Sequence, residues 1–398
     1  MKQYIALLKT TPTFKYLSII QLISYFGAWF SNIAIYTLLL DLNVSKEVIA
    51  FTAMVHFLAG VVQAPFSGAI IDSVKPKVIM LTLLAIEIFA TLFLLFVTDI
   101  ESLWLLYTLI FIKMAAASFY FTTEMSLLPK ILERDKLLKA NELHSIIWSL
   151  SYTLGMAIGG FMVYSFGIEM AFILDASMFV VGFILLYNLE LEVEISQVKE
   201  NLLEMMQNSF RYLKEKPETI HIMMIHAFVG LTAFDALVVL MVDQYYSAII
   251  ATSLALGLLH SFRAIGLIVG PMIIGDWIDN KHLTYIFIGQ AVSLWLWASW
   301  MDNFYLSLLA SIVVGLFTTT LWSYTYTLLQ HNIDEKYYGR IIAYNDMLFL
   351  SSAALTSFMI GFLASNGFSL ESVTTILGFG FIVGGVYYRW VLKTQNVK

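Results

Sequence analysis

Stretches of about twenty consecutive apolar residues recur from one end of this sequence to the other, and short polar segments separate them. A helix of about 20 residues crosses a hydrocarbon core of ~30 Å. Hydrophobic residues make up 60% of the chain and charged residues 13%, which is more apolar surface than a soluble protein can hide. The pattern therefore predicts an all-α membrane protein with about twelve transmembrane helices.

The polar segments set the expected helix positions and the division of the chain. We expect helices near residues 16–40, 46–71, 78–97, 103–127, 140–165, 170–189, 220–242, 247–274, 283–300, 304–330, 341–364 and 370–390. The longest polar stretch predicts an N-terminal six-helix bundle over 1–190, a linker over 191–219 and a C-terminal six-helix bundle over 220–398.

The linker carries an apolar stripe. Val198, Leu202, Met206 and Phe210 recur every four residues among charges, which favours a surface helix that ends before Pro217. A solvated linker is the alternative.

Basic residues occupy alternate loops of the predicted bundle. Those with Lys75 and Lys77, with Lys130 and neighbouring bases, with Lys281 and with Arg340 alternate with loops that hold almost no base. The positive-inside rule then places both termini in the cytoplasm of a multi-pass protein, which we expect in a bacterial inner membrane. The first span lacks a cleavage site, so we expect it to be retained.

Several functional classes find no support in the sequence. The chain has no cysteine, which excludes disulfides and thiolate chemistry. It has no phosphate-binding Gly-Lys-Ser/Thr loop and no basic patch for nucleic acid. His56, His144, His226 and His260 lie apart at spacings that do not favour metal binding, so we expect packing histidines, no metal and no cofactor.

One loop signature appears twice. Gly68, Asp72, Lys75 and Lys77 follow the second predicted helix of the first half, and the second half has its counterpart in Gly275, Asp279 and Lys281. Two parallel six-helix repeats would produce this echo.

The segment Gly68-Ala-Ile-Ile-Asp72-Ser-Val-Lys75-Pro-Lys77 resembles the loop between helices 2 and 3 of the major facilitator superfamily. Ser73 replaces the arginine that usually follows the aspartate. The resemblance implies two six-helix halves, with this loop, its repeat and Arg340 acting as a gate that closes the cytoplasmic side. Capping of a helix N-terminus by Asp72 or its pairing with a base would supply the closing contact. A plain solvated turn is the alternative.

A second resemblance points to one branch of that superfamily. Residues 128–141 and the glycines Gly155, Gly159 and Gly160 resemble exporters of enterobactin-type siderophores and related drug efflux proteins. The glycines match an antiporter motif of helix 5, although close helix packing explains them equally well. Ala28 stands where many relatives carry a helix-1 acid, which argues against proton coupling there.

Five ionisable residues fall deep inside predicted helices, away from the helix ends. Such a group costs ~2.5–3.5 kcal/mol or more at a helix centre, so each needs a partner or a function. We predict that Asp235 pairs with Arg263, and that Glu87 or Asp175 pairs with Lys113. These five are the candidates for proton coupling, with Asp235 first. A structural lock and, for Lys113, snorkelling toward the interface are the alternatives.

Two further acids, Glu124 and Asp346, lie nearer the predicted cytoplasmic ends of their helices. We expect them to act as gate or cap groups.

Aromatic residues are frequent on helices that the resemblance places around a central cavity. The candidates for a substrate wall are Tyr25, Trp29, Asn32, Tyr36, Trp322, Tyr324 and Tyr326. Such a wall suits an amphipathic small molecule. Trp295, Trp297 and Trp300 are expected in an interfacial belt instead.

The sequence thus favours a monomeric secondary transporter that exports an amphipathic drug-like or siderophore-like molecule by alternating access, coupled to protons. Its expected partners are that substrate, protons and the bilayer. A lysolipid or lipid flippase of the same fold is the first alternative. An integral-membrane enzyme is the second, although no clustered catalytic residues support it.

Overall fold

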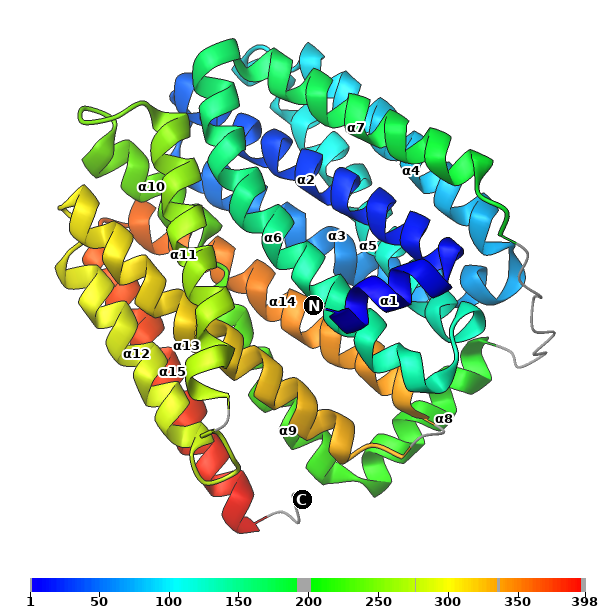
Figure 1. Ribbon diagram of the computed structural model, residues 1–398. Coiled ribbons are helices and arrows are strands. Elements are labelled where there is room, and N and C mark those ends of the chain that lie inside the picture. Colours follow the sequence, from blue (N-terminus) through cyan, green and yellow to red (C-terminus); the bar gives the residue numbers. More distant parts are fainter. Residues whose placement is uncertain (1, 192–201, 276, 335–336, 395–398) are drawn as a thin grey trace. The chain divides into compact units, whose positions relative to one another are not determined.

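The computed structural model of the chain describes residues 2–191, 202–275, 277–334 and 337–394. In chain order its α-helices are α1 (Lys2–Thr10), α2 (Pro12–Asp41), α3 (Lys46–Ser73), α4 (Pro76–Phe93), α5 (Leu103–Ile131), α6 (Arg134–Phe166), α7 (Ile168–Asn188), α8 (Leu202–Glu215), α9 (Pro217–Ala227), α10 (Asp235–Met241), α11 (Thr252–Ile274), α12 (Leu283–Ser299), α13 (Phe304–His331), α14 (Tyr338–Ser365) and α15 (Leu370–Thr394). No strand occurs in these described ranges, which confirms the predicted all-α fold (Figure 1).

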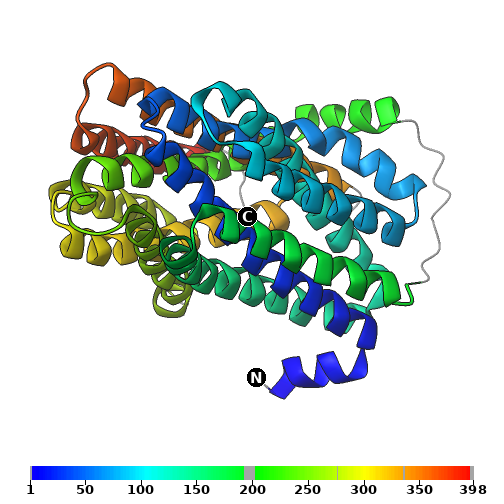
Figure 2. The same cartoon turned by 90° about the horizontal axis from the view of Figure 1, so that it is seen from above.

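Most of these helices are long and apolar enough to cross a membrane. The described residues contain 11 such spans, and α12 is a shorter apolar helix. The helix α1 is too short to span, and Figure 2 shows that it runs at an angle to the long α2 that follows it. The observed number of apolar helices matches the predicted membrane architecture.

The chain forms two compact units. Unit 1 comprises 1–44, 62–198 and 256–261, and unit 2 comprises 45–61, 199–255 and 262–398. In unit 1, α2 packs against α6 and α7, while α4 packs against α5 and α7. In unit 2, α12 lies between α13 and α15, and α14 packs against α9 and the turn after it. The apolar core of unit 1 includes Leu17, Met80, Leu127 and Phe179.

Glycines allow α2 and α6 to approach closely in unit 1. A Cβ at Gly155 would lie 2.8 Å from Cδ1 of Trp29, and one at Gly159 would lie 3.3 Å from Cα of Phe30. Small residues at four-residue spacing permit this backbone approach. These contacts are those of a packing motif, and they carry no information about transport direction.

The helix predicted at 220–242 is not continuous, which corrects the sequence interpretation. The structure has α9, a 3-10 segment at Phe228–Thr232, α10 and a π-helical turn at Val242–Tyr246. A Cβ at Gly230 would lie 2.6 Å from Cβ of Ser352, so α14 packs directly on the break. A broken helix leaves backbone carbonyls that need other partners inside a membrane.

The structure bears on two further predictions, the linker helix and the position of Trp297. Helix α8 lies in the predicted linker and ends before Pro217, whereas Val198 lies outside the described residues. Trp297 does not belong to an interfacial belt: it is fully buried, and its Nε1 donates a hydrogen bond to Ser307 Oγ at 2.7 Å. The polar partner on α13 lets this large ring occupy the core.

Candidate functional site

Four helices of unit 1 bring polar side chains to one buried position. Lys113 Nζ lies 2.5 Å from Asp175 Oδ2 and 2.6 Å from Thr91 Oγ1, and Ser31 Oγ donates to the same Asp175 oxygen. The residues come from α5, α7, α4 and α2 respectively. Both charged side chains are buried. We call these residues, together with Glu87, the buried charge cluster.

The aromatic ring of Phe179 also contacts the lysine. Its ring centre lies 4.8 Å from Lys113 Nζ, which adds a cation–π contact to the ion pair. These partners turn the lysine inward, so the structure does not support the alternative in which Lys113 snorkels to the interface. The lysine side chain is held by groups on two other helices, α4 and α7.

Glu87 adds a second carboxylate to the cluster. It lies on α4, one helical turn before Thr91, and is 4% exposed. It is within electrostatic reach of both Lys113 and Asp175. No ion pair to Glu87 occurs among the residues that the structure describes. The cluster therefore contains one ammonium group and two carboxyl groups.

Asp175 also lies against a glycine of α2. A Cβ at Gly27 would be 2.9 Å from Asp175 Oδ1, an oxygen that has no hydrogen-bond partner in the described part of the chain. The missing side chain at Gly27 thus makes room for the carboxylate.

An aromatic wall covers one face of unit 1. Its rings are Tyr25, Trp29, Phe121, His144, Trp148 and Tyr152. Neighbouring ring centres lie 4.7–6.2 Å apart, as in the pairs formed by Trp29 with Tyr152 and with Trp148. Tyr25 and Trp29 were predicted, whereas the four rings from α5 and α6 were missed as wall residues. A search for aromatic residues at four-residue spacing would have found His144, Trp148 and Tyr152.

The other two predicted wall residues of α2 are Asn32 and Tyr36. Asn32 Oδ1, like Nε1 of Trp29, is buried without a hydrogen-bond partner among the described residues. Such groups can bond to a polar part of a substrate. Tyr36 is 1% exposed and belongs to the core of the unit.

Unit 2 has a smaller aromatic wall around a buried histidine. The rings of Trp322, Tyr326 and Phe349 have their centres 5.5–6.0 Å from that of His226, and Trp322 stacks on Tyr326. His226 Nδ1 lies 2.8 Å from Thr325 Oγ1. The wall unites two of the three predicted residues of α13. Tyr324 lies elsewhere, since alternate residues of a helix face opposite sides.

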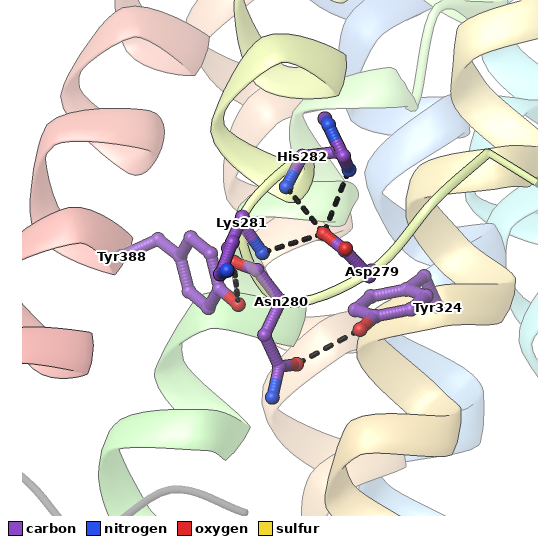
Figure 3. Close-up of polar contacts among 6 residues, drawn as sticks. All are labelled: Asp279, Asn280, Lys281, His282, Tyr324 and Tyr388. Atoms are coloured by element: carbon purple, nitrogen blue, oxygen red, sulfur yellow. Dashed lines mark hydrogen bonds and ion pairs between the residues drawn. The ribbon is translucent and has the colours of Figure 1, made fainter.

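Tyr324 belongs to the turn between α11 and α12 (Figure 3). Its hydroxyl donates to Asn280 Oδ1 at 2.8 Å, and the Tyr388 hydroxyl donates to the Asn280 carbonyl oxygen at 2.8 Å. These contacts fasten the turn to α13 and α15. We therefore separate Tyr324 from the substrate-wall candidates.

Asp279 organises the same turn. Its Oδ1 accepts hydrogen bonds from the backbone N–H groups of Lys281 and His282 at 2.7 and 2.9 Å, and lies 2.8 Å from His282 Nδ1. Desolvation acts to raise the pKa of Asp279, but the backbone hydrogen bonds and the contact with His282 together outweigh it and hold the pKa below its ordinary value. The aspartate thus holds the start of α12.

The corresponding turn of unit 1 is fastened through a lysine. Lys77 Nζ donates to the carbonyl oxygens of Tyr187 and Leu189 at 2.8 and 2.7 Å. A base at a helix C-terminus satisfies open carbonyls and opposes the helix dipole. Lys77 therefore ties the start of α4 to the end of α7, a contact that the sequence did not predict. The surroundings of Gly68 and the side chain of Asp72 lie outside what the structure describes, and Lys75 is exposed.

Arg263 contacts the broken helix that precedes Asp235. A guanidinium nitrogen donates to the Thr232 carbonyl oxygen at 3.0 Å, and the guanidinium carbon lies 4.9 Å from the ring centre of Phe234. The arginine therefore satisfies one of the carbonyls that the break exposes. Asp235 begins α10 one residue later, and its pairing with Arg263 stays a prediction.

Comparison with known proteins identifies the family of this chain. The model of the Major Facilitator Superfamily matches residues 17–242, more than half of the chain. The chain belongs to the major facilitator superfamily. Two Bacillus subtilis (strain 168) relatives are named as uncharacterized MFS-type transporters. YkuC is 33% identical over 93 residues, and YfiS is 26% identical over 203 residues. These matches cover 23% and 50% of this chain, and 22% and 48% of YkuC and YfiS, so the chain spans less than half the length of each.

Solved structures agree on the MFS fold. The nucleoside transporter NupG has a TM-score of 0.73 at 12% identity, covering 96% of this chain and 100% of that chain. A D-xylose-proton symporter has a TM-score of 0.72 at 10% identity, covering 94% and 97%. Identities this low establish the MFS fold alone. Membership of the superfamily supports a membrane transporter rather than an enzyme.

Proposed function

We propose that this MFS protein exports an amphipathic organic molecule by alternating access and that inward movement of protons drives the export. The two aromatic walls support an amphipathic substrate. Aromatic rings with a few unpartnered polar groups suit a molecule with an apolar body and a polar end.

The observation that carries the proton coupling is the composition of the buried charge cluster. Lys113 can neutralise one carboxylate, and Asp175 is the one it contacts. A second buried carboxylate without an ion-pair partner is strongly disfavoured in its charged form, so Glu87 is stable there as the protonated acid. The cluster can therefore hold one exchangeable proton.

The arrangement also supplies a mechanism for exchange. Glu87 and Asp175 lie on different helices, α4 and α7, and both are within electrostatic reach of the Lys113 ammonium on α5. If the helices shift as the transporter changes its accessible side, Lys113 can exchange one carboxylate for the other. The carboxylate that loses the lysine takes up a proton, and the one that gains it releases a proton. We place Asp235 second among the candidates, because Arg263 already has a structural contact.

Transport direction is tested first by substrate uptake into everted membrane vesicles. Respiration makes the lumen acidic, so an exporter driven by protons should accumulate its substrate there. A panel of lipophilic drugs and siderophores identifies the substrate, and a protonophore must abolish accumulation. No accumulation of any compound above vesicles that lack the protein, or accumulation that ignores the protonophore, would contradict proton-driven export.

A second candidate function is favoured by an apolar groove of unit 1. The groove has a volume of about 310 Å³ and is lined by Leu22, Ile23, Phe26, Leu150, Ser151, Leu154 and Met178. Its apolar lining on α2, α6 and α7 suits an acyl chain, as a lysolipid flippase would require. Transfer of a fluorescent lysolipid between leaflets of proteoliposomes, blocked by Leu150→Trp, would favour this function. The protonophore assay on soluble drugs would then be negative.

A further inference from the structure

Glu124 is a buried carboxylate separate from the buried charge cluster. It lies on α5 and is 3% exposed, and its Oε2 has no hydrogen-bond partner in the described part of the chain. No base forms an ion pair with it among these residues. The sequence assigned Glu124 a gate or cap role, yet no backbone N–H of a helix end donates to its carboxylate in the described contacts. A carboxylate in this position lacks a positive charge.

Aromatic residues of α2 and α5 lie near that carboxylate. Tyr25 of α2 and Tyr120 of α5 lie within electrostatic reach of Glu124. Phe121 precedes Glu124 by three residues, so the two side chains share a face of α5. The Phe121 ring centre lies 5.2 Å from that of His144, which also packs edge-on against Tyr25. Tyr25, Tyr120 and Phe121 are therefore the aromatic residues closest to this acid in sequence spacing or electrostatic reach, and His144 extends the aromatic group through Phe121 and Tyr25.

Part of this arrangement is open at the surface of the unit. Phe121 is 40% exposed, whereas Tyr120 is 3% exposed. Gln21 contacts His144, with its Nε2 2.6 Å from the ring Nδ1, so the histidine already has a neutral polar partner. Glu124, by contrast, has no ion-pair partner in the described part of the chain. The exposed Phe121 ring marks the side from which a ligand can reach it.

These observations define the chemistry that fits. A cation is attracted both by a carboxylate and by the faces of aromatic rings, and the attraction is largest where water is excluded. Without a counter-charge a buried acid such as Glu124 is stable in its protonated form, as argued for Glu87. An organic cation can replace that proton as the partner of the carboxylate, whereas an anion or a neutral molecule cannot. We infer that Glu124, with Tyr25, Tyr120 and Phe121, binds the charged end of a lipophilic organic cation. This names the substrate class of the proposed transporter, so it rests on the proposed function.

Binding of two probes of equal shape and opposite charge tests the site without any proton gradient. Tetraphenylphosphonium and tetraphenylborate are titrated into the full-length protein in detergent, and quenching of tryptophan fluorescence reports binding. We expect tetraphenylphosphonium to bind and tetraphenylborate to bind at least tenfold more weakly. Glu124→Gln should weaken tetraphenylphosphonium at least tenfold, whereas Glu101→Gln, an exposed acid in a turn before α5, should leave it unchanged. Equal binding of both probes, or unchanged affinity in Glu124→Gln, would overturn the inference.

A second variant guards against misfolding of the buried substitution. Phe121→Leu replaces an exposed ring and should weaken tetraphenylphosphonium by roughly tenfold, as the loss of a cation–π contact implies. Unchanged tetraphenylphosphonium affinity in this variant would mean that the Phe121 ring is not part of the binding site. The binding assay itself needs no proton gradient. Charge-selective binding that depends on Glu124 would therefore stand even if transport proved independent of protons.

Discussion

Lys113 on α5 and Asp175 on α7 form a buried ion pair with Nζ and Oδ2 2.5 Å apart, and Ser31 and Thr91 bond to it from two other helices. The pair joins the four helices that make up most of unit 1. It is therefore both a structural contact and half of the proposed proton site.

Breaking this pair should destabilise unit 1. Asp175→Asn leaves the Lys113 ammonium buried without its counter-charge, at a cost of about 3–5 kcal/mol. Adding Lys113→Met to Asp175→Asn removes the orphan charge and should recover much of the thermal stability. The midpoint of thermal unfolding in detergent measures both effects. A double variant no more stable than Asp175→Asn would mean that the pair does not act as a unit.

Arg263 should stabilise the break between α9 and α10. Arg263→Gln loses a charged hydrogen bond to the Thr232 carbonyl oxygen, worth about 1.5–3 kcal/mol. If Asp235 pairs with this arginine, the added change Asp235→Asn should restore part of the loss, because it removes an orphan carboxylate. The same thermal measurement decides. If the stability losses of the two single variants simply add in the double variant, Arg263 does not pair with Asp235 and contacts only the Thr232 carbonyl oxygen.

Much of this architecture follows from the sequence, because membrane-spanning helices obey a simple length and hydropathy rule. This rule did not predict the break near Gly230, because hydropathy stays high across the whole span. The break depends on α14, which packs where a side chain at Gly230 would lie. The need for a partner also indicated Lys113 and Asp175, although spacing could not decide between Asp175 and Glu87. The burial of Trp297 depends on one hydroxyl of another helix, Ser307, and no local pattern contains that contact.

Gly155 should tolerate no side chain at the contact between α2 and α6. Gly155→Leu would force a branched side chain into the space taken by Trp29 and the Phe26 carbonyl, and overpacking of this kind typically costs about 1–3 kcal/mol or more. We expect a strong loss of folded protein in fluorescence-detected size-exclusion chromatography. Gly339→Ala is the matched control, because nothing lies within 4 Å of its Cβ position. Equal yields of the two variants would contradict the packing role.

The turn held by Asp279 should loosen in acid. The folded-state pKa of Asp279 is lowered, so its contribution is present above its unfolded pKa and is lost as pH falls through the folded pKa. Protection of the Lys281 and His282 amides from hydrogen exchange, corrected for intrinsic rates, should therefore fall only below pH ~4. Asp279→Ala should lack this protection already at pH 7. A wild-type turn that stays protected at pH 2, or an alanine variant as protected as wild type, would refute the role.

The central claim is that the buried charge cluster exchanges one proton for each substrate movement, and Glu87→Gln tests it most directly. This change removes the titrating carboxylate without orphaning a base, unlike a change at Lys113 or Asp175. A proton drawn through 100 mV supplies ~2.3 kcal/mol, enough for more than a tenfold substrate gradient. In everted vesicles with an acidic lumen, we predict that Glu87→Gln abolishes uphill accumulation of the substrate while downhill exchange continues, and that Asp235→Asn still accumulates it. Full uphill accumulation by Glu87→Gln would contradict the account.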